Sequence, residues 1–187
     1  MIIELILWIV KVVYFILPGV FANIIPVIIK KNFKVLASPL DFNMKLKGKR
    51  IFGKNKTFRG LLFGVLSSIA IAGIQTVLYQ NPAFRNISLQ DYSTTNFVLF
   101  GFFIGFGSLL GDLINSFVKR RLDIKSGSKF MPWDQLNAPI GGIVFASWVY
   151  NGDKFWVLII SVIVIAFALH LINRTIAYYL KISDERW

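Results

Sequence analysis

Two carboxylates, Asp112 and Asp134, flank a short basic loop in a chain that is otherwise strongly apolar. Residues 97–110, directly before Asp112, carry no charge, so this acid lies near the end of a helix long enough to cross a membrane. An unpaired carboxylate is costly there, and acids in membrane segments are therefore functional by default. Oxygen ligands arriving from two helices suit Mg²⁺, which takes few protein carboxylates and completes its shell with phosphates. The pair predicts a magnesium site that binds a nucleotide or a polyphosphate.

The segment that contains Asp112 predicts a helix with one polar face. If the helix continues to its basic end, the residues spaced i, i+3, i+4 and i+7 share that face: Asp112, Asn115, Ser116 and Lys119. Gly101, Gly105 and Ser108 continue roughly the same face, and small residues let a neighbouring helix approach closely. The simpler structural interpretation of Asp112 is an ion pair with Lys119 or Arg120.

The segment after the basic loop predicts a second helix with polar residues at its start. Asp134, Asn137 and Gly141 recur at i, i+3 and i+7, and Pro139 suits a first helical turn. A cap formed by Asp134 or Asn137 is the structural alternative to metal binding. The clearly apolar part, residues 138–150, is shorter than the roughly 20 residues that a bilayer demands, unless the helix begins nearer Asp134.

A second basic cluster, residues 48–60, precedes another apolar segment. Lys54, Lys56 and Arg59 surround Thr57 at an expected helix start, where free N–H groups attract anions. The GxxxxGK[ST] spacing of a P-loop is absent, so a P-loop ATPase is not expected. Basic loops also act as topology signals or as contacts to anionic lipid, and this cluster taken alone leaves those roles open.

The composition is that of a membrane protein. Hydrophobic residues make up 56% of the 187 residues, and the mean hydropathy is +0.64, above that of an ordinary soluble domain. The chain has no cysteine, which excludes disulfides and thiolate zinc sites. A net charge of +12 would favour nucleic acid as the partner of a soluble protein. In a membrane protein it mainly reports orientation, so no nucleic-acid partner is expected.

Five apolar segments predict an all-α integral membrane protein with about five transmembrane helices, forming one domain over residues 1–187. The segments are approximately residues 2–29, 57–79, 96–118, 138–150 and 155–180. Residues 30–59 hold ten Lys and Arg with one acid, and residues 119–129 hold five more basic residues. The positive-inside rule places both basic loops in the cytoplasm, the N-terminus outside and the C-terminal tail inside. The predicted site therefore lies at the cytoplasmic face of the cell membrane.

Two blocks of sequence resemble the CDP-archaeol synthase family, integral membrane cytidylyltransferases that are related to bacterial CDP-diacylglycerol synthases. The first block, residues 39–60, reads PLDFNMKLKGKRIFGKNKTFRG and ends in a KTxRG motif. The second, residues 111–137, reads GDLINSFVKRRLDIKSGSKFMPWDQLN. Together with the five-segment pattern, the resemblance covers nearly the whole chain.

The resemblance implies a Mg²⁺-dependent reaction. CMP is transferred from CTP to the phosphate of an isoprenoid lipid, 2,3-bis-(O-geranylgeranyl)-sn-glycerol 1-phosphate, with release of pyrophosphate. The implied metal ligands are Asp112, Asp134 and Asn137. The implied catalytic residues are Asp112, Asp134, Lys119 and Arg120. The implied CTP-binding residues are Lys56, Thr57, Arg59, Ser116 and Lys125.

One residue departs from the family pattern and leaves other functions open. The family generally has DQLD where this chain ends its motif at Asn137, so the expected metal site carries one negative charge fewer. One alternative is a CDP-diacylglycerol-type synthase that acts on phosphatidic acid. The others are a degenerate transporter, in which the same polar residues line an ion path, and a membrane adaptor that only binds lipid or protein. Neither of the last two accounts for both motif blocks.

Overall fold

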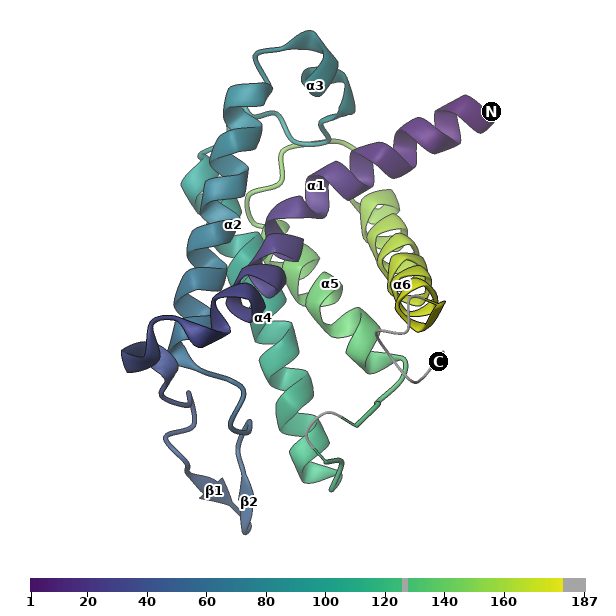
Figure 1. Ribbon diagram of the computed structural model, residues 1–187. Coiled ribbons are helices and arrows are strands. Elements are labelled where there is room, and N and C mark those ends of the chain that lie inside the picture. Colours follow the sequence, from purple (N-terminus) through teal and green to yellow (C-terminus); the bar gives the residue numbers. More distant parts are fainter. Residues whose placement is uncertain (126–127, 180–187) are drawn as a thin grey trace.

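Helices dominate the computed structural model, which describes residues 1–125 and 128–179 (Figure 1). A helix occupies most of each of the five apolar segments, which confirms the all-α fold class. In chain order the α-helices are α1 (Ile2–Ile28), α2 (Phe58–Leu78), α3 (Pro82–Ile87), α4 (Phe97–Arg121), α5 (Trp133–Ala146) and α6 (Phe155–Tyr179). Two 3-10 turns, η1 (Ile29–Lys31) and η2 (Lys34–Ala37), follow α1.

A small antiparallel hairpin, β1 (Lys45–Leu46) and β2 (Lys49–Arg50), is an addition that the sequence analysis did not predict. Its two-residue turn, Lys47 and Gly48, has positive φ at both positions, 49° and 77°. Two positive φ values are the pattern of a type I′ turn, whose twist matches that of a hairpin. The hairpin gives backbone hydrogen bonds to a polar loop that has no helix of its own.

The protein is a multi-pass membrane protein. Within the described residues, three helical segments are long and apolar enough to span a bilayer: Ile2–Lys31, Phe58–Leu78 and Phe97–Arg121. Helix α5 has 14 residues, and the apolar part of α6 within this search runs over Phe155–Leu169. Five spans and the orientation across the membrane therefore stay predictions, and the predicted cytoplasmic tail, residues 180–187, lies outside the described residues.

Helix α5 begins at Trp133, which places Asp134 in its first turn, but it ends at Ala146, and its 14 residues remain fewer than a bilayer span needs. The prediction that Asp134 or Asn137 caps this helix is wrong, because Pro132 holds the N-cap position and no side chain bonds there. The Asp134 carboxylate instead accepts a hydrogen bond from the N–H of Phe130, at 2.8 Å. The Asn137 amide donates to the carbonyl oxygen of Trp133, at 2.9 Å.

Helix α4 lies at the centre of the bundle and packs against α1, α2 and α5. Its glycines permit close contact with two neighbouring helices, α5 at Gly107 and Gly111, and α2 at the predicted Gly101 and Gly105. A Cβ added at Gly141 of α5 would overlap the carbonyl oxygen of Gly107, and a Cβ at Gly111 would overlap that of Asn137. On another side of α4, Gly105 lies directly against Ser68 of α2. The close approach of α4 to α5 at Gly107 and Gly111 brings the polar face of α4 against the first turn of α5.

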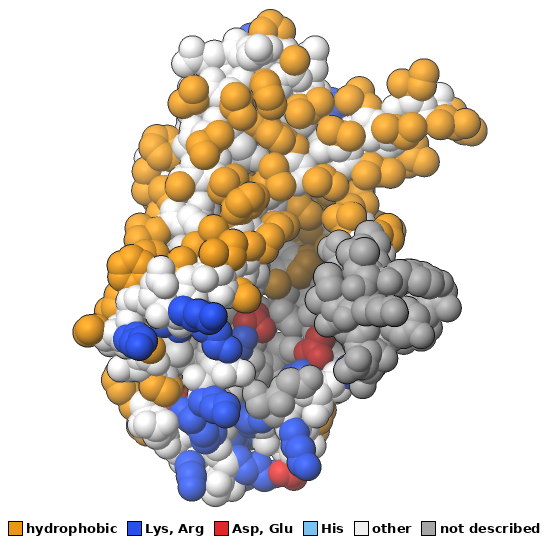
Figure 2. Space-filling view, in the orientation of Figure 1, with side chains coloured by type: hydrophobic (Ala, Val, Ile, Leu, Met, Phe, Trp, Pro, Cys, Tyr) orange, Lys and Arg blue, Asp and Glu red, His pale blue; other side chains and the backbone are white. Residues whose placement is uncertain are grey.

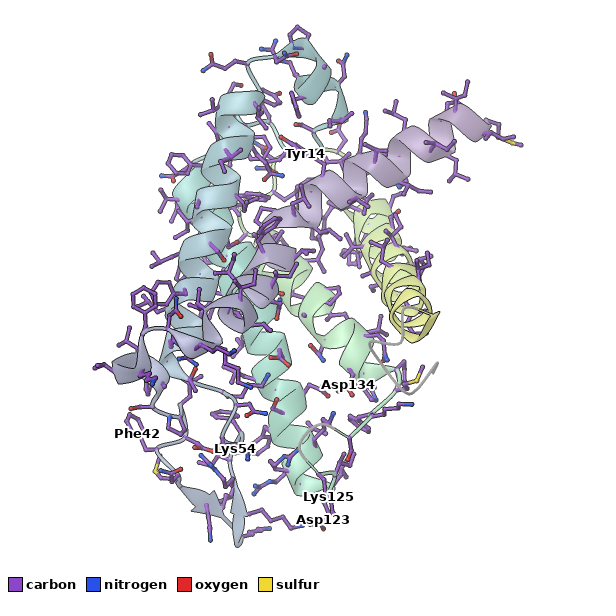
Figure 3. All side chains as sticks on the ribbon, viewed as in Figure 1. Tyr14, Phe42, Lys54, Asp123, Lys125 and Asp134 are labelled. Atoms are coloured by element: carbon purple, nitrogen blue, oxygen red, sulfur yellow. The ribbon has the colours of Figure 1, made fainter. Side chains whose placement is uncertain are left out.

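Charge separates along the length of the molecule. Apolar side chains cover the helices in the upper part of Figure 2, and Lys and Arg gather at the lower end, where the hairpin meets the end of α4. Lys54, Asp123 and Lys125 lie at this end, and Tyr14 lies towards the opposite end, near α3 (Figure 3). The two basic loops therefore share one end of the bundle, as the charge pattern predicts.

Candidate functional site

Two cavities meet where α1 and α4 approach the basic end. The first has a volume of about 440 Å³ and lies between the end of α1, the basic loop, the start of α2 and α4. The second has a volume of about 470 Å³ and lies between α1, α4, α5 and α6. Asn23 of α1 and Asp112 of α4 line both cavities. Acidic side chains are visible in the hollow between the apolar and basic parts in Figure 2.

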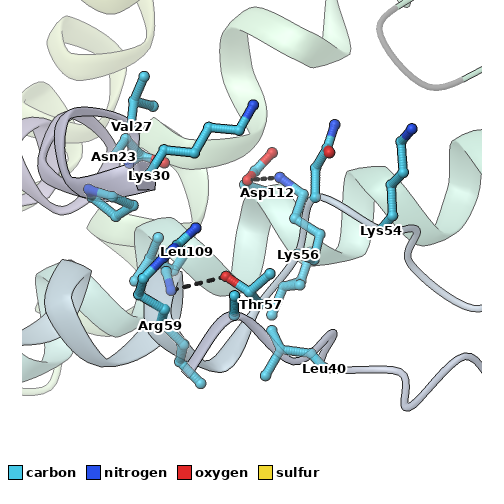
Figure 4. Close-up of a pocket in the computed structure, with 16 residues that line it drawn as sticks. Asn23, Val27, Lys30, Leu40, Lys54, Lys56, Thr57, Arg59, Leu109 and Asp112 are labelled. Carbon is cyan, nitrogen blue, oxygen red and sulfur yellow. Dashed lines mark hydrogen bonds and ion pairs between the residues drawn. The ribbon is translucent and has the colours of Figure 1, made fainter. Parts of the chain in front are cut away.

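The first cavity is basic. Lys30, Lys54, Lys56 and Arg59 line it, together with the N-terminal turn of α2 (Figure 4). Thr57 caps that helix by accepting a hydrogen bond from the N–H of Gly60, at 3.1 Å. A cationic wall beside a helix N-terminus suits phosphate oxygens.

The side chain of Arg59 is held in place and is only 7% exposed. Its guanidinium donates to the carbonyl oxygen of Asn32, at 2.7 Å, which ties the start of α2 to the turn after α1. Hydrogen bonds at Thr57 and at Arg59 therefore fix this part of the cavity wall.

Asp112 faces the basic loop and forms an ion pair with Lys56 (Figure 4). The two side chains are 32% and 24% exposed, so both remain accessible from the cavities. The structural prediction of a pair between Asp112 and Lys119 or Arg120 is wrong. Lys119 lies two helical turns further along α4, about 10 Å of helical rise, and extends to the start of α5 instead.

The second cavity is polar at one end and apolar along its length. Asp112, Asp134, Gln135 and Asn137 form the polar end. Side chains such as Phe15, Ile104 and Val162 line the rest, and they come from α1, α4 and α6. A cavity of this kind accommodates a molecule with a polar head and a hydrocarbon body.

The carboxylate of Asp134 is held by three donors. The Lys119 Nζ lies 2.9 Å from both carboxylate oxygens, and the Asn115 Nδ2 lies 2.7 Å from one of them. The Phe130 amide supplies the third donor, as described above. Lys119 also donates to the carbonyl oxygen of Ser128, at 2.6 Å, and is 9% exposed. Asn115 and Lys119, two residues of the predicted polar face, thus connect α4 to α5.

The polar end of the second cavity carries oxygen donors of the kind that Mg²⁺ prefers. Asp112, Asp134 and Asn137 supply carboxylate and amide oxygens to one cavity, and hard oxygen donors are what this ion prefers. Among the described residues, no group of three or more His, Cys, Asp or Glu side chains gathers in a form that could hold a metal. Two carboxylates and one amide would be compatible with Mg²⁺, which takes few protein oxygens when it binds together with a nucleotide.

The structure divides the predicted site residues into two groups. Those that line a cavity are Lys56, Thr57, Arg59, Asp112, Asp134 and Asn137, and Lys119 supports them from behind Asp134. Ser116, Arg120 and Lys125 line neither cavity. Lys125 is exposed on the α4–α5 loop, and Arg120 is half-buried at the end of α4.

Asn23 and Gln135 are polar cavity residues that the sequence did not single out. Asn23 donates hydrogen bonds to Ser108, at 2.7 Å, and to the carbonyl oxygen of Gly19. An isolated amide within an apolar span was the signal that marks it. Gln135 is 4% exposed, but it follows Asp134 in a mixed segment, and no pattern set it apart.

Comparison with known proteins gives one family. The family model of CarS-like CDP-archaeol synthase matches residues 2–187. The chain is 34% identical over 152 residues to the CDP-archaeol synthase of Methanocaldococcus jannaschii, covering 80% of this chain and 84% of that protein. It is 30% identical over 188 residues to the CDP-archaeol synthase of Methanococcus maripaludis, covering 98% and 99%. It is 33% identical over 175 residues to that of Pyrococcus furiosus, covering 93% and 95%.

A solved structure agrees with these matches. It is described as an intramembrane enzyme for archaeal membrane lipids biosynthesis, and it superposes with a TM-score of 0.66 at 26% sequence identity. The match covers 86% of this chain and 90% of that one. The resemblance that the two motif blocks indicated is confirmed by the family model and by the relatives. The chain belongs to the CarS-like CDP-archaeol synthase family.

Proposed function

We propose that this protein is a CDP-archaeol synthase, which transfers CMP from CTP to 2,3-bis-(O-geranylgeranyl)-sn-glycerol 1-phosphate and releases pyrophosphate. Membership in the family supports the reaction. The observation that supports this site is the junction at Asp112 between a basic cavity and a largely apolar one. A charged nucleotide and a lipid phosphate have to meet at such a junction, because each needs a different environment.

In the proposed reaction a phosphate oxygen of the lipid attacks the α-phosphorus of CTP. The new P–O bond joins lipid and CMP, and the bond from the α-phosphorus to the bridging oxygen breaks, so that pyrophosphate leaves with its electron pair. Lys54, Lys56 and Arg59 bind the triphosphate and balance its charge, with the start of α2 beside them. The apolar length of the second cavity holds the isoprenoid chains and directs the lipid phosphate towards Asp112. Catalysis is then positioning and charge stabilisation, without a covalent enzyme intermediate.

Asp112, Asp134 and Asn137 are the residues that would hold Mg²⁺. When bound, the ion would supply charge neutralisation at the phosphates. Lys119 and Asn115 fix the Asp134 carboxylate, so its position does not depend on the ligand. The excess of Lys and Arg at this end supports a cytoplasmic location of the site, where CTP is available.

The direct test uses detergent-purified protein with radiolabelled CTP, Mg²⁺ and the geranylgeranylated glycerol phosphate. Phosphatidic acid serves as acceptor in a parallel reaction. We expect label in the lipid phase with the ether lipid. Label with phosphatidic acid alone would instead establish the diacyl-type synthase, and no label with either acceptor would contradict the proposed transferase.

Exchange of Asn137 for Asp is expected to preserve or raise turnover and to lower the Mg²⁺ concentration that gives half-maximal rate. The added carboxylate strengthens an oxygen site for a divalent cation. Magnesium titration of the initial rate measures the effect. The matched control is Asn81→Asp, which adds the same charge at the cap of α3, where Asp serves equally well. A tenfold loss of rate in Asn137→Asp alone would contradict a metal-ligand role for this position.

A further inference from the structure

Asp41 is the single acid of the basic loop, residues 30–59, and it is buried, with 1% exposure. Its carboxylate accepts hydrogen bonds from the Arg50 guanidinium, at 2.6 and 3.2 Å. It also accepts from the backbone N–H groups of Asn43, Phe52 and Gly53, at 3.1, 3.2 and 3.0 Å. Burial alone would raise the pKa of Asp41, but these bonds outweigh it and hold the pKa well below its ordinary value. Asp41 is therefore ionised at neutral pH, and all the donors that surround its carboxylate belong to the loop itself.

The contacts of Asp41 fix one end of the short segment that carries two cavity lysines, Lys54 and Lys56. Phe52 and Gly53, which Asp41 binds, directly precede this segment. The other end is fixed by the residue next to Asp41, because the N–H of Leu40 donates to the carbonyl oxygen of Lys56, at 2.8 Å. The neighbouring residues Asp41 and Leu40 therefore hold the two ends of the segment.

Arg121 attaches the same loop to helix α4. Its guanidinium donates to the carbonyl oxygens of Leu46, Lys49 and Arg50, at 2.7, 3.2 and 2.7 Å. It also lies over the ring of Phe117, at 5.1 Å from the centroid. Since Arg121 and Asp112 belong to one helix, the hairpin is held in a fixed relation to the carboxylate that pairs with Lys56.

We propose that Asp41 and Arg121 are positioning residues for the nucleotide. Neither lines the basic cavity. They act through the hairpin, which holds Lys54 and Lys56 beside Asp112 before the triphosphate arrives. Because the loop is already ordered, nucleotide binding does not lose free energy in ordering it. This inference rests on the proposed function, in which the basic cavity binds CTP.

The test is equilibrium binding of radiolabelled CTP to the detergent-solubilised protein with Mg²⁺ and without lipid acceptor. We expect Asp41→Asn and Arg121→Gln each to raise the Kd for CTP about tenfold. The first removes a charged hydrogen-bond acceptor, and the second removes the guanidinium that binds the hairpin carbonyls. In the transfer assay the KM for CTP rises by the same factor, and the KM for the lipid stays unchanged. Lys45→Gln is the control, because it removes a hairpin charge whose exposed side chain takes no part in these bonds.

The outcomes are distinguishable. A variant that loses CTP-binding sites but keeps the wild-type Kd in the remaining protein has only lost folded molecules, and that result overturns the proposal. Unchanged Kd values at full occupancy overturn it as well. If the wild-type protein binds CTP but transfers nothing, the proposed reaction fails, and the Kd comparison still decides the positioning role. A wild-type protein that binds no CTP would overturn both.

Discussion

Replacement of Asp112 by Asn is expected to lower kcat for CMP transfer at least about a hundredfold, the effect of removing one well-placed electrostatic group from an active site. Asp112 lines both cavities, and in the proposed reaction the nucleotide and the lipid phosphate meet beside it. The amide keeps the shape of the side chain but loses the charge that pairs with Lys56 and that would bind Mg²⁺ in the proposed reaction. Initial rates at saturating CTP and lipid measure the loss.

The control for this substitution is Asp153→Asn, the same change at an exposed residue in the connection before α6, outside both cavities. Its rate is expected to stay within about twofold of wild type, since isolated surface substitutions have small effects. The thermal unfolding midpoint of Asp112→Asn should also stay close to wild type, because Lys56 is partly exposed and can be solvated. A fully active Asp112→Asn protein would remove Asp112 from the reaction and with it the proposed metal site.

Exchange of Gly141 for Ala is expected to destabilise the protein by about 1–3 kcal/mol, the range for overpacking in a filled interior. The added methyl group would meet the carbonyl oxygen of Gly107, a backbone atom that cannot rotate away. Helices α4 and α5 therefore have to separate, and the carboxylates that they carry move apart. We expect transfer activity to fall at least about tenfold, because misplacement of about 1 Å can cost far more. Thermal unfolding in detergent and initial rates report the two effects.

The same substitution at Gly73 of α2 serves as the matched control. A Cβ at this position meets only ring atoms of Phe97, at 3.3 and 3.4 Å, and a ring at the start of α4 can shift slightly. Ala is also the better helix former by roughly 1 kcal/mol, so this variant is expected to be neutral or slightly more stable. Equal losses in the two variants would mean that the close α4–α5 contact has no special role.

Much of the fold follows from the sequence, for a physical reason. Long apolar segments form helices in a membrane because their backbone groups have no water to bind. The charge pattern likewise predicts that the two basic loops share one end. The hairpin was not predictable in the same way, since its two-residue strands are too short to show a pattern and depend on Arg121 for support.

The candidate site follows the sequence less completely. Spacing along α4 identifies Asp112, Asn115 and Lys119 as neighbours on one face, and α4 does present them together. Spacing does not reveal that Asn115 and Lys119 bind Asp134, which comes from the next helix. Nor does it separate Ser116 and Arg120, which line neither cavity, from the residues that do.

The sequence by itself determined the helices, the placement of acids and basic loops near one end, and the family to which the motif blocks point. These properties are local, because periodicity, charge and short motifs are set within a few turns of chain. Only the tertiary structure decided which cation meets which acid: Lys56 pairs with Asp112, and Lys119 pairs with Asp134. The reason is that glycine contacts set how closely α4 and α5 approach, while Arg121 and Asp41 set where the hairpin lies. The glycine contacts and those of Arg121 join segments far apart in the chain, and no spacing within one segment encodes them.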